Sequence, residues 1–120
     1  MRRGWLLYLI LIFSLSSLPG NPELHRLPVW WDKPAHLLLY AGLGWLHARA
    51  SDRRAGKMRA LLRSVLLSAV VGLSDELYQG LVPNRSQELM DWLADLSGGS
   101  AGAAAALAMR RKRPQEKLAT

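Results

Sequence analysis

Residues 30–50 read WWDKPAHLLLYAGLGWLHARA, and this stretch combines ionisable side chains with an apolar run. Asp32, Lys33 and His36 stand at its head, and an almost continuous series of apolar residues follows. Ionisable groups within an apolar helix are costly and mark functional sites by default. The stretch therefore predicts a helix over residues 34–50 whose first turns belong to a polar site.

Three further apolar runs cover residues 5–18, 61–82 and 89–109 of this 120-residue chain. A chain of this length forms one domain, and a membrane span needs roughly 20 largely apolar residues. The last two runs meet that length, whereas 5–18 and 34–50 are shorter. We predict an all-α integral membrane protein, a compact bundle of four transmembrane helices within a single domain, residues 1–120.

The first run also has the charged start and short apolar core of a signal peptide. No small-x-small cleavage site follows it, and the run ends at Pro19-Gly20. We therefore expect residues 5–18 to remain as the first helix.

The basic residues predict the orientation of the bundle. Every lysine and arginine except Arg26, Lys33 and Arg85 lies before the first run, within residues 49–63 around the second loop, or after the fourth run. Basic segments beside membrane spans stay in the cytoplasm. Both termini, the 49–63 loop and the basic tail 110–120 are thus expected on the cytoplasmic side of the bacterial inner membrane.

A net charge of +7 also raises the question of nucleic acid binding. No aromatic residue interrupts residues 49–63, and this loop cannot build a nucleic-acid fold. We interpret it and the tail as topology determinants that contact anionic lipid, with the bilayer as partner and no nucleic acid. The chain has no cysteine, which excludes disulfides and thiolate metal sites.

Most acidic residues fall at the opposite, outer ends of the predicted helices. Residues four apart share a helix face, so Asp32, His36 and Tyr40 form one such face. Asp91 and Asp95 form another, which continues through glycines that permit close helix packing. The acidic residues placed at the outer side are Glu23, Asp32, Asp75, Glu76, Glu88, Asp91 and Asp95.

These residues suit two kinds of chemistry. One imidazole with several carboxylates can bind a divalent metal such as zinc or manganese, or can perform metal-free acid–base work. We predict no obligatory cofactor, and a divalent metal stays possible. The catalytic or metal-binding candidates are His36, Glu76, Asp91 and Asp95, and the substrate-binding candidates are Asp32, Lys33, Tyr40, Gln79 and Arg85. We expect His25 and His47 at the surface.

The stretches DKPAHLLLY (32–40), DELYQ (75–79) and PNRSQELMDWLADLSGG (83–99) resemble the VanZ-like family of small bacterial membrane proteins. The resemblance extends over about residues 5–108 and rests on the order and spacing of four blocks. Asn84 stands where the family often has glycine, and Asp95 where many members have asparagine. The four blocks comprise Asp32, Lys33 and His36; Glu76 and Gln79; Pro83 and Arg85; and Asp91, Asp95 and Gly98.

The resemblance implies a role in the cell envelope, since the family takes its name from a member associated with resistance to the glycopeptide teicoplanin. It assigns no reaction, so whether the chain is an enzyme stays open. We expect a polar pocket at the outer leaflet that binds or acts on a lipid-linked, anionic or glycopeptide-related component. The alternative is a structural or partner-binding membrane protein whose polar network only stabilises helix packing.

The absence of cysteine makes the predicted topology directly testable. We expect single cysteines at Glu23 and Gln87 to react with an impermeant thiol reagent on intact cells. Cysteines at Ser51 and Thr120 should react only after the membrane is permeabilised. Labelling of 51 and 120 with 23 and 87 silent would reverse the orientation.

Overall fold

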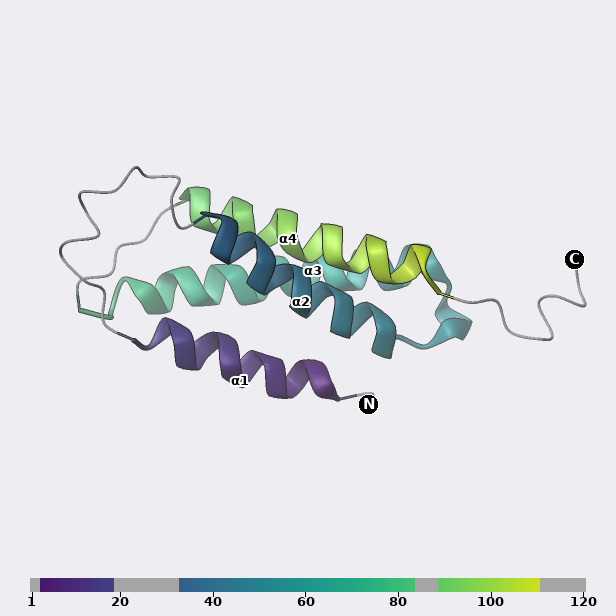
Figure 1. The fold of residues 1–120 in the computed structure, drawn as a ribbon, viewed down its shortest axis with the longest axis horizontal. Coiled ribbons are helices and arrows are strands. Elements are labelled where there is room, and N and C mark those ends of the chain that lie inside the picture. Colours follow the sequence, from purple (N-terminus) through teal and green to yellow (C-terminus); the bar gives the residue numbers. More distant parts are fainter. Residues whose placement is uncertain (1–2, 19–32, 84–88, 111–120) are drawn as a thin grey trace, which may run out of the picture.

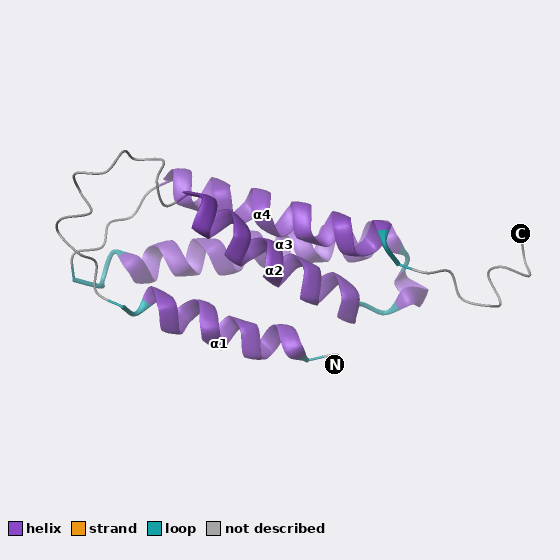
Figure 2. Cartoon of the chain, viewed as in Figure 1, coloured by secondary structure: helices purple, strands orange, loops and turns teal. Residues whose placement is uncertain are grey.

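The computed structural model describes residues 3–18, 33–83 and 89–110, and within them the chain is all-α (Figures 1 and 2). This confirms the predicted class and the four main helices. The elements are α1 (Gly4–Ser16), α2 (Lys33–Ala50), the short 3-10 helix η3 (Arg53–Ala55), α3 (Lys57–Gln79) and α4 (Leu89–Ala108).

The bounds of α3 differ most from those expected, 61–82. The helix starts earlier because Gly56, with φ of 87°, adopts a left-handed backbone that redirects the chain out of η3. It ends earlier because the backbone N–H groups of Leu81 and Val82 bond three residues back instead of four. Pro83 follows and disfavours a helical residue before it.

The packing of the helices brings the starts of α2 and α4 together with the end of α3 (Figure 1). The most extensive contact is between α2 and α4, and α4 also packs against α3. α1 lies against α2 and makes a smaller contact with α3. Residues far apart in sequence therefore share one end of the bundle.

Glycines allow α2 and α4 to approach closely. A Cβ built on Gly44 would lie 2.0 Å from the carbonyl oxygen of Gly99. A Cβ on Gly102 would lie 2.0 Å from the carbonyl oxygen of Ala41. No side chain fits at such distances, so the two backbones touch directly, as in membrane helices packed through small residues.

Hydrogen bonds from side chains to backbone carbonyls connect the other helices. The indole N–H of Trp92 in α4 donates to the carbonyl of Ala69 in α3 (2.9 Å). The hydroxyl of Tyr8 in α1 donates to the carbonyl of Leu39 in α2 (2.6 Å). These bonds hold both neighbours of the α2–α4 pair in register with it.

Polar residues are buried inside the bundle, and large apolar residues cover the outside. The inward face of α3 carries Ser64, Ser68 and Asp75, each at most 1 % exposed. The outward face of the same helix carries leucines and valine that are all more than half exposed: Leu62, Leu66, Val70, Leu73 and Leu77. This arrangement inverts the usual amphipathic helix of a globular protein.

None of the helices in the described ranges combines the length with the average hydropathy expected of a membrane span. The prediction that the four helices are transmembrane therefore stays a prediction.

The expectation of a surface position is wrong for His47. Its ring is partly buried, with Nδ1 2.7 Å from the hydroxyl oxygen of Ser64 in α3. The ring also meets the edge of Trp5 in α1, with centroids 5.0 Å apart. The reason is that α1 and α3 both reach α2 at this level, which sequence spacing does not reveal. His25 lies outside the described residues.

The close α2–α4 contact predicts a specific sensitivity to side-chain volume. Gly102→Ala should lower the free energy of unfolding by about 1–3 kcal/mol, since the added methyl group forces two backbones apart. Thermal or denaturant unfolding measures the effect. Gly4→Ala is the matched control, because a Cβ there meets nothing within 4 Å. Equal losses of stability in the two variants would contradict a tight helix contact.

Candidate functional site

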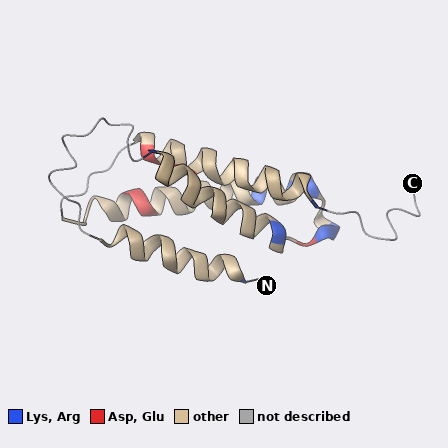
Figure 3. Ribbon diagram, viewed as in Figure 1, with Lys and Arg blue, Asp and Glu red and all other residues tan. Residues whose placement is uncertain are grey.

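Ionisable side chains meet where α2 and α4 begin and α3 ends. We call this group the polar cluster and define it as Lys33, His36, Tyr40, Asp75, Glu76, Asp91 and Asp95. Figure 3 shows the acidic residues of α3 and α4 near this end of the bundle, whereas the basic residues of the described ranges, apart from Lys33, lie toward the opposite end. Three helices contribute: residues spaced by about one helical turn face inward on α2 and α4, and the adjacent Asp75 and Glu76 are both buried on α3.

His36 is held between two carboxyl groups of α4. Its Nδ1 lies 2.8 Å from Oδ1 of Asp95, a distance at which a ring N–H donates to a carboxylate. Its Nε2 lies 3.8 Å from Oδ2 of Asp91. The spacing of Asp91 and Asp95 by one turn of α4 thus places a carboxyl group on each side of the imidazole.

Lys33 makes an ion pair with Asp91. Asp91 is buried, and the Lys33 side chain is 15 % exposed. Lys33 is the first residue of α2, and Asp91 lies in the first turn of α4. The pair therefore joins the starts of the two helices and compensates the buried charge of Asp91.

Tyr40 lies deeper, one turn below His36 on α2. Its side chain is 0 % exposed, and its hydroxyl donates to Oδ2 of Asp75 in α3 (3.2 Å). Tyr40 was predicted to be a substrate-binding residue, and that role stays a prediction. Its burial and this bond show that it supports Asp75 within the polar cluster.

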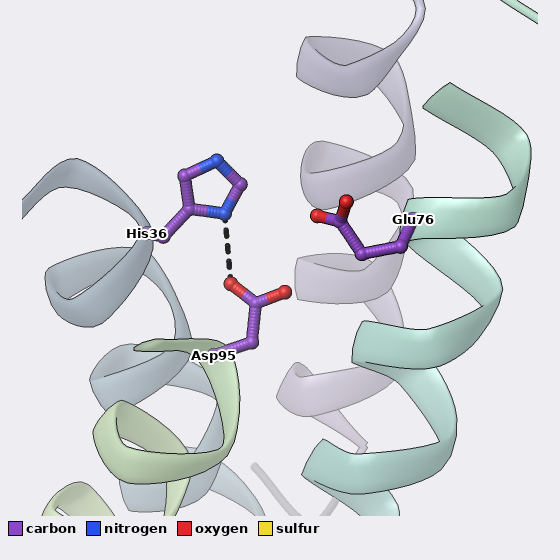
Figure 4. Close-up of side chains that lie close together, drawn as sticks. All are labelled: His36, Glu76 and Asp95. Carbon is purple, nitrogen blue, oxygen red and sulfur yellow. Dashed lines mark hydrogen bonds and ion pairs between the residues drawn. The ribbon is translucent and has the colours of Figure 1, made fainter. Parts of the chain in front are cut away.

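His36, Glu76 and Asp95 come from three different helices and converge (Figure 4). Each offers one nitrogen or oxygen ligand atom, and these atoms all lie within 4.8 Å of one another. Glu76 and Asp95 are buried, and His36 is partly buried. One imidazole and two carboxylates at this separation can share a proton or a cation.

Several buried oxygens of this region have no hydrogen-bond partner among the described residues. They include Oδ1 of Asp75, Oδ2 of Asp95 and the hydroxyl of Ser68. Most buried polar atoms in proteins have a partner, so such atoms indicate a function or a bound group. Figure 4 shows the second oxygen of Asp95 turned away from His36, toward the side of Glu76.

All four catalytic or metal-binding candidates, His36, Glu76, Asp91 and Asp95, thus lie in the polar cluster. Among the substrate-binding candidates, Lys33 and Tyr40 belong to it, and Gln79 is buried at the last residue of α3. Asp32 and Arg85 lie outside the described residues.

Asp75 was assigned to the polar face but not to the site. Its bond to Tyr40 makes it part of the cluster. The sequence carried a signal for it, because Ser68, Gly72 and Asp75 follow one face of α3.

The profile of the VanZ/LLP1 family matches residues 5–110, which is most of the chain. The chain belongs to the VanZ/LLP1 family. The match confirms the resemblance drawn from the sequence blocks. No curated protein and no solved structure matches the chain.

Three of the four blocks that carry the VanZ-like resemblance meet in the polar cluster. The first supplies His36, the second Glu76, and the fourth Asp91 and Asp95. Of the third block, the described residues include only Pro83. Segments separated by tens of residues in this VanZ/LLP1 chain therefore meet at one end of the bundle.

The Tyr40–Asp75 hydrogen bond predicts that removing the single hydroxyl oxygen of Tyr40 lowers the stability of the fold. Tyr40→Phe should lower the free energy of unfolding by about 1–3 kcal/mol, because a buried carboxyl group loses its donor. The midpoint of thermal unfolding measures it. Tyr78→Phe is the control, since this phenol is 38 % exposed and bonds an exposed serine. A loss no greater than that of the control would show that Asp75 does not need the phenol.

Proposed function

We propose that the chain is an integral membrane protein of the bacterial cell envelope whose polar cluster binds an anionic, lipid-linked envelope component. The observation that carries the proposal is the convergence of His36, Glu76 and Asp95 inside a bundle with an apolar exterior. Such a site offers polar recognition at a depth that a lipid headgroup reaches.

The membrane placement is supported by the face that each helix turns outward. Leu7 and Ile10 of α1, Leu38 of α2 and Leu66 of α3 are all more than 60 % exposed. Exposed apolar surface on this scale is rare on soluble monomers and marks contact with a partner or a membrane. The mean hydropathy of a whole helix averages this apolar surface with the buried polar groups, whereas lipid would contact only the surface.

The orientation is supported by the separation of charge along the bundle (Figure 3). The loop and helix ends near η3 carry Arg49, Arg53, Arg54, Lys57 and Arg110, far from the polar cluster. Under the positive-inside rule the basic end faces the cytoplasm. The polar cluster then lies toward the outer leaflet of the inner membrane.

A binding role is supported by the unpartnered oxygens. A network that only stabilised packing would be expected to satisfy its buried polar atoms, because each one without a partner is costly. Oδ1 of Asp75 and Oδ2 of Asp95 have no such partner among the described residues. Both oxygens are available to a bound group.

Lys33 would make the first contact with the ligand, because it lies in the first turn of α2 and is the more exposed side chain of its ion pair. An ammonium group binds phosphate or carboxylate as a point charge. Arg85, which lies outside the described residues, stays a contact predicted from the sequence alone.

A structural role is the second candidate, and specific contacts favour it. Lys33–Asp91 and His36–Asp95 join α2 to α4, and Tyr40–Asp75 joins α2 to α3. Interhelical polar contacts of this kind stabilise membrane bundles by about 0.6–2 kcal/mol each. The two roles predict different results when a charged side chain is replaced by a neutral one of similar size: loss of ligand binding alone, or loss of accumulation in the membrane.

Lys33→Gln tests the proposal, since it removes the positive charge that would contact the phosphate and keeps a hydrogen-bond donor. We expect normal accumulation in the membrane and at least tenfold weaker binding of a polyprenyl phosphate in nanodiscs. The comparison lipid is the uncharged polyprenol, which lacks only the phosphate. Lys57→Gln is the matched control, because Lys57 begins α3 at the opposite end.

Two outcomes would contradict the proposal. Equal affinity of the wild-type protein for the phosphate and the alcohol would exclude recognition of the anionic group. Loss of accumulation in proportion to the loss of binding would favour the structural role instead.

A further inference from the structure

The balance of charge in the polar cluster requires explanation if its ligand is an anion. Asp75, Glu76, Asp91 and Asp95 are all at most 5 % exposed. Lys33 compensates Asp91 through its ion pair, which leaves His36 facing the other carboxyl groups. The described part of the cluster is therefore rich in negative charge, and this favours a cation over a bare phosphate.

The donor atoms at the centre are those of a metal site. His36, Glu76 and Asp95 each present one ligand atom, all within 4.8 Å of one another. Zinc binds imidazole nitrogen and carboxylate oxygen at about 2.0–2.2 Å, so its ligands lie about 3–4 Å apart. Small rotations of the three side chains would bring their ligand atoms from within 4.8 Å of one another to that separation.

A second observation points to a bound group independently of this spacing. Asp95 is 0 % exposed, and its Oδ2 has no hydrogen-bond partner among the described residues. Figure 4 shows this oxygen on the side of Asp95 that faces Glu76. A fully buried carboxylate oxygen directed toward another carboxylate is unfavourable unless a proton or a cation lies between them.

We propose that His36, Glu76 and Asp95 bind one divalent transition-metal ion of the zinc or manganese type. Three protein ligands leave a coordination position open, as in metal sites that bind substrate. That position would accept a phosphate or carboxylate oxygen, and this second part rests on the function proposed above. The metal converts an acidic cluster into a site for an anion.

The surroundings of His36 suit a metal ligand. Metal-bound histidines almost always donate their other ring N–H to a carboxylate, carbonyl or water. Here the imidazole has Asp95 on its Nδ1 side and Asp91 3.8 Å from Nε2. With Nδ1 on the metal, the Nε2 proton faces Asp91, which Lys33 in turn orients. Asp91 is thus a positioning residue for the site.

The ligand set also distinguishes between metals. Calcium takes six to eight oxygen ligands, and magnesium retains most of its water. One nitrogen and two oxygens match zinc or manganese better. The absence of cysteine removes the thiolates that would otherwise bind zinc elsewhere on the chain.

The test uses the full chain in detergent micelles, purified through a tag without histidine and stripped with chelator. Isothermal titration with Zn²⁺ and, separately, electron paramagnetic resonance with Mn²⁺ measure binding. We expect one ion per chain for at least one metal, and a higher midpoint of thermal unfolding that chelator reverses.

Variants then locate the ion. His36→Gln, Glu76→Gln and Asp95→Asn should each weaken binding by more than about 100-fold, whereas Asp91→Asn should weaken it by about 10–100-fold through lost orientation. His47→Gln and Asp52→Asn are matched controls at the far end of the bundle and should leave affinity unchanged. Helix content and elution volume establish that each variant is folded.

The outcomes separate this inference from the proposed function. Absence of binding, or equal affinity in wild type and folded Glu76→Gln, would overturn the metal site. Binding of polyprenyl phosphate that chelator leaves unchanged would also overturn the metal's role while the proposed function stands. Metal binding without any preference for polyprenyl phosphate over polyprenol would retain the metal site and remove the proposed ligand.

Discussion

The direct contact between the backbones of α2 and α4 is the constraint on which the polar cluster depends. Gly44 and Gly102 leave no room for a side chain between the two helices, so the helices remain close along their lengths. At their starts this closeness brings Lys33 to Asp91 and His36 to Asp95. A wider separation would leave both aspartates buried without Lys33 and His36 as partners, which is strongly destabilising. Packing and charge pairing therefore require each other.

The inverted distribution of polarity explains how a small bundle can hold so many carboxyl groups. A soluble four-helix bundle of this size relies on an apolar core. Here glycine, alanine, serine and acidic residues share the interior with two small apolar clusters, which include Leu43 and Leu107, while other leucines cover the exterior. Van der Waals contact between backbones and interhelical hydrogen bonds add to these clusters, as in helix bundles with apolar surroundings. The interior is then free to form a site.

The two possible roles of the cluster are related through its unpartnered oxygens. The contacts of Lys33, His36 and Tyr40 join helices and would be useful for stability alone. Oδ1 of Asp75 and Oδ2 of Asp95 add nothing to such a network in the absence of a ligand. A protein that retains them bears a cost in stability, which is characteristic of sites shaped by function.

Local sequence determined the four helices and the faces that they bury. Apolar runs predicted α1, α2, α3 and α4, and the one-turn spacing of Asp91 and Asp95 predicted an inward face, because helical periodicity depends only on neighbouring residues. The sequence blocks also identified the VanZ-like family. The tertiary structure decided which atoms meet. Asp95 contacts Nδ1 of His36, and Tyr40 donates to Asp75. His47 lies between Trp5 and Ser64. These contacts depend on the rotation and separation of whole helices, which follow from the glycines between α2 and α4 and not from the spacing within any one helix.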